Sequence, residues 1–83
     1  MASTYKLEQV KRGDNGTSVY LLQEILFSRG LYKGERDMKF GPATEKAVID
    51  YQTARIKAGA KLGSADGIVG PKTWADLLAL AKV

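Results

Sequence analysis

The residues best suited to hold a ligand occur in two nearly identical stretches, residues 37–44 and 66–73. Both have the pattern Asp-x-x-apolar-Gly-Pro-x-Thr, and the two prolines of the chain hold the same place in each. Proline suits the first position of a helix because its ring fixes φ and it lacks an amide donor that the first turn cannot use. Free amides and a threonine hydroxyl at such a helix start can donate to carboxylates and carbonyls. We expect at least one stretch to border a ligand groove.

The same stretches also have a purely structural explanation. Gly41 and Gly70 permit tight turns before the prolines, and Asp37 and Asp66 can accept backbone amides within those turns. A catalytic pair of Asp37 and Asp66 is disfavoured, because nothing in the sequence brings the two carboxylates to a working separation. The chain has no histidine and no cysteine, which removes the commonest general base and the usual zinc ligands. We therefore expect a non-enzyme without a cofactor or metal.

Composition and charge limit the classes of partner that the chain is expected to bind. The 83 residues suffice for one small domain, and the net charge is +4. Basic residues are spread along the chain with no run of five, so a nucleic-acid-binding tail is not predicted. Residues 1–6 lack the apolar core of a signal peptide, and no stretch approaches the roughly 18 apolar residues of a membrane span. We therefore expect either release by lysis or another route, or origin of this chain in a larger exported one.

Three helices are expected to position the two stretches. A first helix over about 15–29 would follow a possible Asp14 N-cap and end at a left-handed Gly30. The second would run from Pro42 to about residue 57 or 58, with Gly59 as its stop, and the third would begin at Pro71. Short extended pieces could pair near residues 40 and 69. We expect an N-terminal arm at residues 1–9 and an all-α, three-helix bundle at 10–83.

Several side chains are expected inside this bundle. Trp74, Leu77, Leu78 and Ala81 would form the buried stripe of the third helix, with the indole N–H of Trp74 seeking a partner. Gln23 and Gln52 hold matching places on the apolar stripes of the first two helices. Because a buried amide must be hydrogen-bonded, we expect both glutamines to brace loop backbone.

The order of these residues resembles the peptidoglycan-binding domain found beside bacterial and phage cell-wall hydrolases. The resemblance covers about residues 10–80. It is carried by Gly13-x-x-Gly16-x-x-Val19-x-x-Leu22-Gln23-x-x-Leu26-x-x-x-Gly30-Leu31, by Asp37-x-x-Phe40-Gly41-Pro42-x-Thr44-x-x-Ala47-Val48-x-x-Tyr51-Gln52, and by Asp66-Gly67-x-Val69-Gly70-Pro71-x-Thr73-Trp74.

Two departures stand out against the family pattern. Met38 replaces a glycine that usually follows the first aspartate, so the first turn is expected to bend differently if it needs a positive φ. The run between Gln52 and Asp66 is some six residues longer than usual. It should give a longer second helix or an extra loop on one face, either of which could reshape a groove.

The resemblance implies non-catalytic binding of peptidoglycan, through its glycan or its stem peptide, at the cell wall or in the periplasmic or extracellular space. A cell-wall hydrolase is the implied associated protein. Tyr32, in a loop, would stack on sugar rings. The expected ligand-binding residues are Tyr32, Asp37, Phe40, Gly41, Thr44, Asp66, Gly70 and Thr73.

Two other functions stay open. A protein-docking module of a phage particle or secretion assembly would expose an apolar patch, for example Tyr20, Leu21 and Phe27 on the first helix. A basic nucleic-acid binder would gather its lysines on one face.

Overall fold

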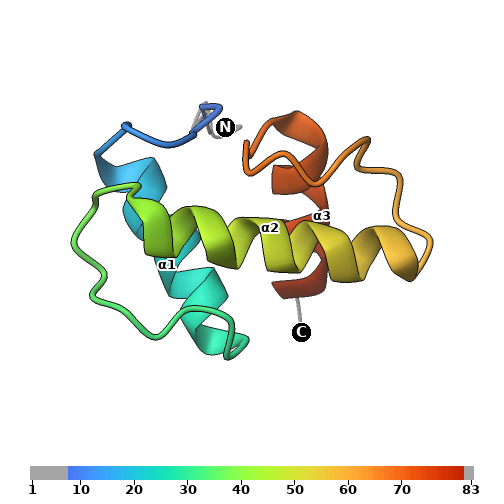
Figure 1. The fold of residues 1–83 in the computed structure, drawn as a ribbon, viewed down its shortest axis with the longest axis horizontal. Helices are drawn as coiled ribbons and strands as arrows, with labels where there is room; N and C mark the ends of the chain where they lie inside the picture. The colour runs from blue at the N-terminus through green and yellow to red at the C-terminus, as the bar shows by residue number, and fades with distance from the viewer. Residues whose placement is uncertain (1–7, 82–83) are drawn as a thin grey trace, which may run out of the picture.

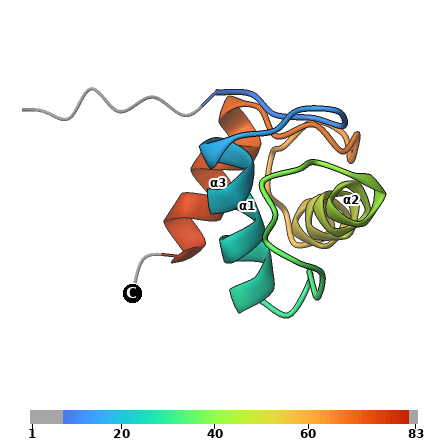
Figure 2. The ribbon, with the colours of Figure 1, turned by 90° about the vertical axis from the view of Figure 1, so that its left-hand side faces the viewer.

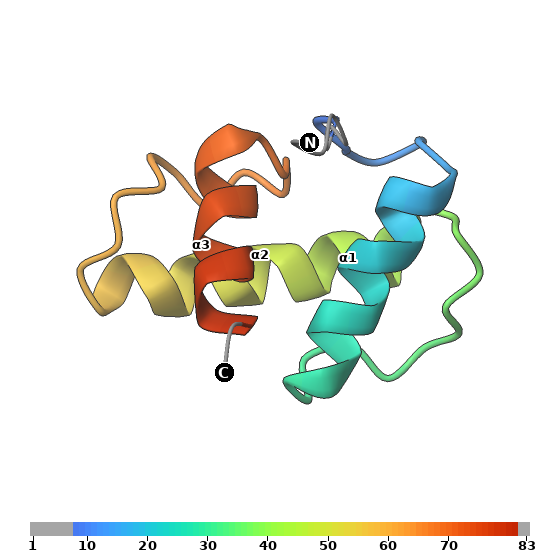
Figure 3. The ribbon, with the colours of Figure 1, turned by 180° about the vertical axis from the view of Figure 1, so that it is seen from behind.

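Three helices make up the fold of residues 8–81, the part of the chain that the computed structural model describes. They are α1 (Thr17–Ser28), α2 (Pro42–Lys57) and α3 (Pro71–Ala81). Figure 1 shows α2 running across the molecule with α1 and α3 behind it, and Figures 2 and 3 confirm that both pack on the same face of α2. The predicted all-α architecture is confirmed.

The helix starts follow the prolines where a proline is present. α2 and α3 begin at Pro42 and Pro71, as predicted. α1 begins two residues later than expected, after Gly16, and no side chain caps its first turn. The prediction of Asp14 as N-cap is wrong, because the Asp14 carboxylate instead accepts the Lys11 amide at 3.0 Å and closes the preceding turn.

Glycines end the first two helices, as predicted. Gly30 has φ +77 and Gly59 has φ +103, the left-handed region that glycine enters without strain. The amide after Gly30 donates to the Leu26 carbonyl at 2.9 Å, and the amide after Gly59 donates to the Arg55 carbonyl at 2.9 Å. Both ends satisfy carbonyls that would otherwise lack a helical partner.

A segment ahead of α1 ties the two proline-led turns together. Val10 and Val69 form an isolated antiparallel bridge, with amide-to-carbonyl distances of 3.1 and 2.9 Å, and Asn15 bridges Lys39. The predicted extended pieces near residues 40 and 69 are therefore present. In Figure 1 this segment (blue) spans the top of the molecule from α1 toward α3. Residues 1–7 of the predicted arm lie outside the described residues.

The core lies where the three helices and the segment around Val10 meet. Its buried apolar residues are Val10, Val19, Leu22, Ile25, Leu26, Tyr32, Phe40, Ala47, Val48, Tyr51, Val69, Trp74 and Leu77. The indole N–H of Trp74 donates to the Glu8 carbonyl at 2.9 Å, which confirms the expected burial and partner. Leu78 is 41% exposed, so its predicted place in the buried stripe is wrong, and the side chain of Ala81 lies outside the described part.

Gln23 is fully buried and holds the first turn from inside. Its side-chain oxygen accepts the Met38 amide at 3.1 Å. Its side-chain nitrogen donates to the Lys39 carbonyl at 3.0 Å and to the Thr44 hydroxyl at 3.1 Å. One amide thus links α1, the turn and the first turn of α2.

Gln52 repeats this arrangement in the second half. It accepts the Gly67 amide at 2.9 Å and donates to the Ile68 carbonyl at 3.0 Å and the Thr73 hydroxyl at 3.2 Å. Each partner follows its counterpart around Gln23 by the same 29 positions. The prediction that both glutamines brace loop backbone is confirmed, and the two halves share one structural unit.

An ion pair joins α2 to α3 beside the core. The Arg55 guanidinium donates to both carboxylate oxygens of Asp76, at 2.8 and 3.2 Å, and the Tyr51 hydroxyl donates to the same carboxylate. The Arg55 hydrogen bonds hold the pKa of Asp76 below its ordinary value. Burial, followed by the hydrogen bond to Asp76, raises the pKa of Tyr51.

The hydrogen bonds of Gln52 to the second turn, here called the glutamine clamp, can be tested with Gln52→Leu, which keeps the size of the side chain. The change strands buried donors and acceptors in the turn, so we expect the free energy of unfolding to fall by about 2 to 3 kcal/mol. Urea unfolding followed by circular dichroism measures the loss. Thr53→Ala, at the exposed neighbouring position, should change stability by less than about 0.5 kcal/mol. Equal stability of the two variants would contradict the clamp.

The Asp76 ion pair predicts a specific pH dependence. A lowered carboxyl pKa contributes stability above the ordinary value of 3.8, and this contribution is lost as the pH falls through the folded-state pKa. Asp76→Asn should therefore cost about 1 to 2 kcal/mol at neutral pH, with the difference from the wild type shrinking toward roughly pH 2.

A matched control is Asp50→Asn, which removes the exposed Lys46–Asp50 pair on α2. It should cost less than about 0.5 kcal/mol at neutral pH. Thermal melts between acidic and neutral pH provide the measurement, and a constant gap between wild type and Asp76→Asn would contradict the linkage.

Candidate functional site

The second proline-led turn borders a surface hollow of about 270 Å³, here called the α3 hollow. It is lined by Gln9, Leu62, Asp66, Ile68, Gly70, Pro71, Lys72 and Thr73. Three of the predicted site residues, Asp66, Gly70 and Thr73, therefore come together in one concave place.

The α3 hollow combines one apolar wall with a few polar groups. Leu62 and Ile68 are half-buried and supply apolar surface, whereas the side chain of Lys72 is exposed at the helix start. The Asp66 carboxylate accepts the Ile68 amide at 3.0 Å, so it fixes the turn. The Thr73 hydroxyl is buried against Gln52. The groups that can meet a ligand are the Lys72 ammonium, the Gln9 side chain, the exposed Asp66 carboxylate, the helix-start backbone and the apolar wall.

The first turn is built like the second, with a buried apolar residue and a buried threonine at matching positions. Phe40 and Thr44 are 2% and 1% exposed, so both contribute from the interior. The Asp37 carboxylate accepts the Lys39 amide at 3.0 Å, and this hydrogen bond lowers the pKa of Asp37. Gly41 is half-buried just before α2. These four predicted residues do not line the α3 hollow, so the two turns do not form the single cleft that was expected.

Tyr32 does not have the exposure that stacking requires. Only 6% of it is exposed, and its hydroxyl donates to the Glu35 carbonyl at 2.5 Å. The prediction of a sugar-stacking Tyr32 is therefore contradicted, because the ring serves the core and closes the loop after α1. One edge of the ring still lines a surface depression of about 300 Å³ shared with Lys33 and Lys46.

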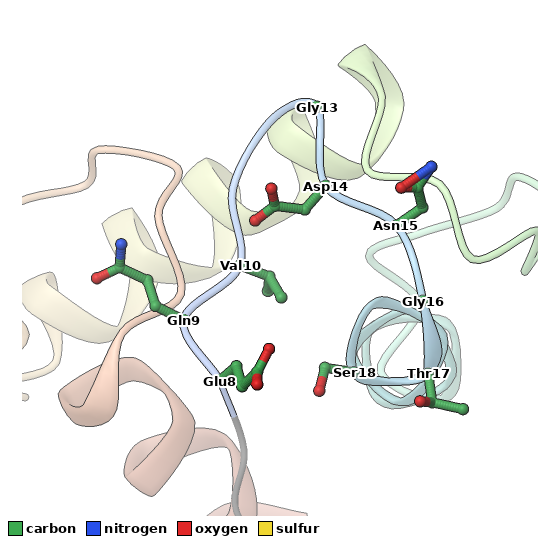
Figure 4. A pocket seen from close by; sticks show the side chains of 9 residues that line it. All are labelled: Glu8, Gln9, Val10, Gly13, Asp14, Asn15, Gly16, Thr17 and Ser18. Carbon is green, nitrogen blue, oxygen red and sulfur yellow. The ribbon is translucent and has the colours of Figure 1, made fainter.

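The sequence reasoning missed a second hollow, of about 400 Å³, above the start of α1. Figure 4 shows the Glu8 and Ser18 side chains facing each other across it, with Asp14 at its edge. We call it the α1 hollow. The Gly13–Gly16 turn signalled a bend in the sequence but gave no sign that residues 8–10 would form the opposite wall.

Gln9 links the two hollows, since it lines both. In Figure 4 its side chain points away from the α1 hollow, and its side-chain oxygen approaches Gly70 on the other side. The segment around Gln9 therefore separates the α1 hollow from the α3 hollow, and the bridge between Val10 and Val69 fixes its position.

Met38 adopts the conformation that glycine has in the second turn. Its φ is +67, close to the +78 of Gly67. The prediction of a differently bent first turn is wrong, because Gln23 binds the Met38 amide just as Gln52 binds the Gly67 amide. The clamp outweighs the steric cost of a left-handed side-chain-bearing residue, which is about 1 to 2 kcal/mol.

Neither a metal-binding carboxylate cluster nor a membrane-spanning helix is found among the described residues. Within 8–81, no three carboxylates gather as a metal site would need. None of α1, α2 and α3 has the length and apolar character to cross a bilayer.

The fold is a small three-helix module with hollows beside the starts of α1 and α3, and comparison with known proteins gives its family. A family model described as a putative peptidoglycan binding domain matches residues 15–77, which is most of the chain. The chain belongs to this peptidoglycan-binding domain family.

Solved structures support the assignment. The SleB N-terminal domain superposes with a TM-score of 0.79 and 32% identity, covering 95% of this chain and all of that one. A Burkholderia AP3 phage endolysin superposes with a TM-score of 0.72 and 37% identity, covering 87% of this chain and 25% of its own. A peptidoglycan-binding protein from Clostridioides difficile, solved with glutamine hydroxamate, superposes with a TM-score of 0.73 and 34% identity, covering 86% of this chain and 40% of its own.

A curated relative matches at the sequence level. It is an uncharacterised protein from the bpoA1 3′ region of Kitasatospora aureofaciens, 42% identical over 69 residues. The match includes 82% of this chain and 53% of the relative, so the chain spans about half the length of that protein.

The strain at Met38 can be relieved by Met38→Gly. Glycine adopts the left-handed conformation freely, and Met38 is 44% exposed, so little packing is lost. We expect the free energy of unfolding to rise by about 0.5 to 1 kcal/mol after the entropy of glycine in the unfolded chain is counted. Urea unfolding measures the gain. Lys39→Gly, one position on, should instead destabilise, and a loss of stability in Met38→Gly would contradict the strain.

Proposed function

We propose that this domain binds peptidoglycan without altering it and thereby holds an associated protein at the bacterial cell wall. The observation that carries the proposal is the family match over residues 15–77, which includes both proline-led turns. The α3 hollow supplies a concave surface at the second of these turns. No histidine or cysteine is available anywhere in the chain for acid–base or nucleophilic work, which fits a binding role.

The chemistry of the α3 hollow suits a peptide stem. Stem peptides carry carboxylates and amide carbonyls, both of which accept hydrogen bonds. The Lys72 ammonium and the positive end of α3 provide donors and favourable potential. Leu62 and Ile68 offer an apolar wall for short side chains or methyl groups.

The predicted site residues divide into two roles in this proposal. Asp66 and Gly70 shape the hollow directly, and Thr73 fixes its floor through Gln52. At the first turn, Asp37 and Gly41 form the corresponding surface, with Phe40 and Thr44 supporting it from below. Tyr32 acts by holding the connecting loop against α1.

An associated cell-wall hydrolase is the partner we propose. Among the similar structures are a phage endolysin, in which the matched part is a quarter of the chain, and the N-terminal domain of SleB. Affinity from one shallow hollow is modest, so retention at the wall would gain from linkage to a second binding or catalytic domain. The proposed place of action is the cell wall.

Retention on purified sacculi, stripped of teichoic acid and at moderate salt, tests the function. We expect the wild-type protein to pellet with the sacculi. Lys72→Ala should weaken retention by about three- to ten-fold, because a charge-assisted hydrogen bond is lost. Lys57→Ala removes the same charge from an exposed position at the end of α2 and should leave retention unchanged.

Two results would contradict the proposed wall binding. Wild-type protein that stays in the supernatant would overturn wall binding and favour a protein-docking role. Retention that vanishes with a modest increase in salt, and that falls equally in both lysine variants, would indicate nonspecific polyanion binding instead.

A further inference from the structure

The outward face of α1 carries two exposed aromatic rings that the proposed site does not use. Tyr20 is 40% exposed and Phe27 is 45% exposed, and they lie seven residues apart on the same helix. Seven residues correspond to two turns, or roughly 10.5 Å along the axis. Both rings line a depression of about 390 Å³ together with residues 33–36. We call this the α1 aromatic surface.

Charged side chains lie beside these two rings. The Arg36 guanidinium lies 4.0 Å from the centre of the Phe27 ring and forms an ion pair with Glu24 at 3.5 Å. A hydrogen bond to the same Glu24 carboxylate raises the pKa of the Tyr20 hydroxyl. The ion pair of Glu24 and Arg36 therefore lies beside both rings and supplies polar groups next to them.

The charges around the rings balance. Lys33 and Arg36 are matched by Glu24 and Glu35, in contrast to the net charge of +4 of the whole chain. A locally neutral surface suits an uncharged ligand and gives no attraction for a polyanion. The carboxylates and the guanidinium remain good partners for hydroxyl groups.

We infer that the α1 aromatic surface binds the glycan strand of peptidoglycan, with Tyr20 and Phe27 each packing against a sugar ring. The inference rests on the proposed function and adds a glycan contact to the peptide contact at the α3 hollow. Sugar rings present C–H faces that pack on aromatic rings, and hydroxyl edges that hydrogen-bond to carboxylates and guanidinium groups.

A protein partner fits this surface less well. The core of a protein interface is continuous and apolar. Here Leu21 packs toward the interior, and the charged Glu24 lies between Tyr20 and Phe27 on the helix. The outward patch of Tyr20, Leu21 and Phe27 that would mark a docking module is therefore incomplete.

Binding of a short, soluble oligomer of N-acetylglucosamine, followed by NMR titration, tests the inference alongside retention on sacculi. We expect Tyr20→Ala and Phe27→Ala each to weaken oligomer binding by about three- to ten-fold. Phe27→Tyr, which keeps the ring, should restore it. Leu78→Ala removes an equally exposed apolar side chain from α3 and should have no effect.

The outcomes separate this inference from the proposed function. Wild-type retention on sacculi with no oligomer binding, or with binding unchanged in Phe27→Ala, overturns the glycan surface and leaves wall binding intact. Failure of the wild type on sacculi overturns wall binding, whereas shifts on the oligomer at Tyr20 and Phe27 would still support the surface. A dimer in sedimentation that Phe27→Ala dissociates would overturn the inference in favour of self-association.

Discussion

The fold depends on two buried glutamine side chains that replace missing backbone partners. Each turn before a proline-led helix leaves an amide and a carbonyl pointing inward, and an unpaired buried group of this kind costs roughly 1 to 3 kcal/mol. Gln23 and Gln52 satisfy these groups and, in the same step, bind the threonine of the following helix. Because a glutamine amide has both a donor and an acceptor, one side chain fixes the turn and the helix direction together.

The hydrogen bonds of Gln52 also fix polar residues around the α3 hollow. The Asp66 and Thr73 side chains are committed to internal hydrogen bonds, so the shape of the α3 hollow is set before any ligand arrives. Lys72 remains at the rim as an exposed cation. Preformed geometry of this kind reduces the ordering cost of binding.

Much of the fold was predictable because its signals are local. Pro42 and Pro71 fixed two helix starts, Gly30 and Gly59 marked two ends, and the apolar spacing placed most of the core. The late start of α1 was not, because it depends on the pairing of Asn15 with Lys39, which are distant in sequence. Leu78 was misplaced because helical spacing defines a stripe but not its width.

The candidate site was less accessible to sequence reasoning. Its residues lie in two similar motifs, but the motifs do not reveal that the second borders the α3 hollow whereas Asp37, Phe40, Gly41 and Thr44 of the first do not. The α3 hollow is not formed by one continuous stretch, because its wall at Gln9 comes from the beginning of the chain, whereas the α1 hollow is lined by residues 8–18 alone. Met38 was predicted wrongly for a different reason. Its hydrogen bond to the distant Gln23 holds a backbone conformation that methionine disfavours.

The hydrogen bond from Trp74 to Glu8 has a practical consequence. The chain has one tryptophan, and its indole N–H is bound to the backbone of the segment that separates the two hollows. Emission from an indole responds to changes in its polar surroundings. Occupancy of either hollow that shifts this dividing segment would therefore alter the natural fluorescence of the protein, which gives it an optical probe beside both hollows without any added label.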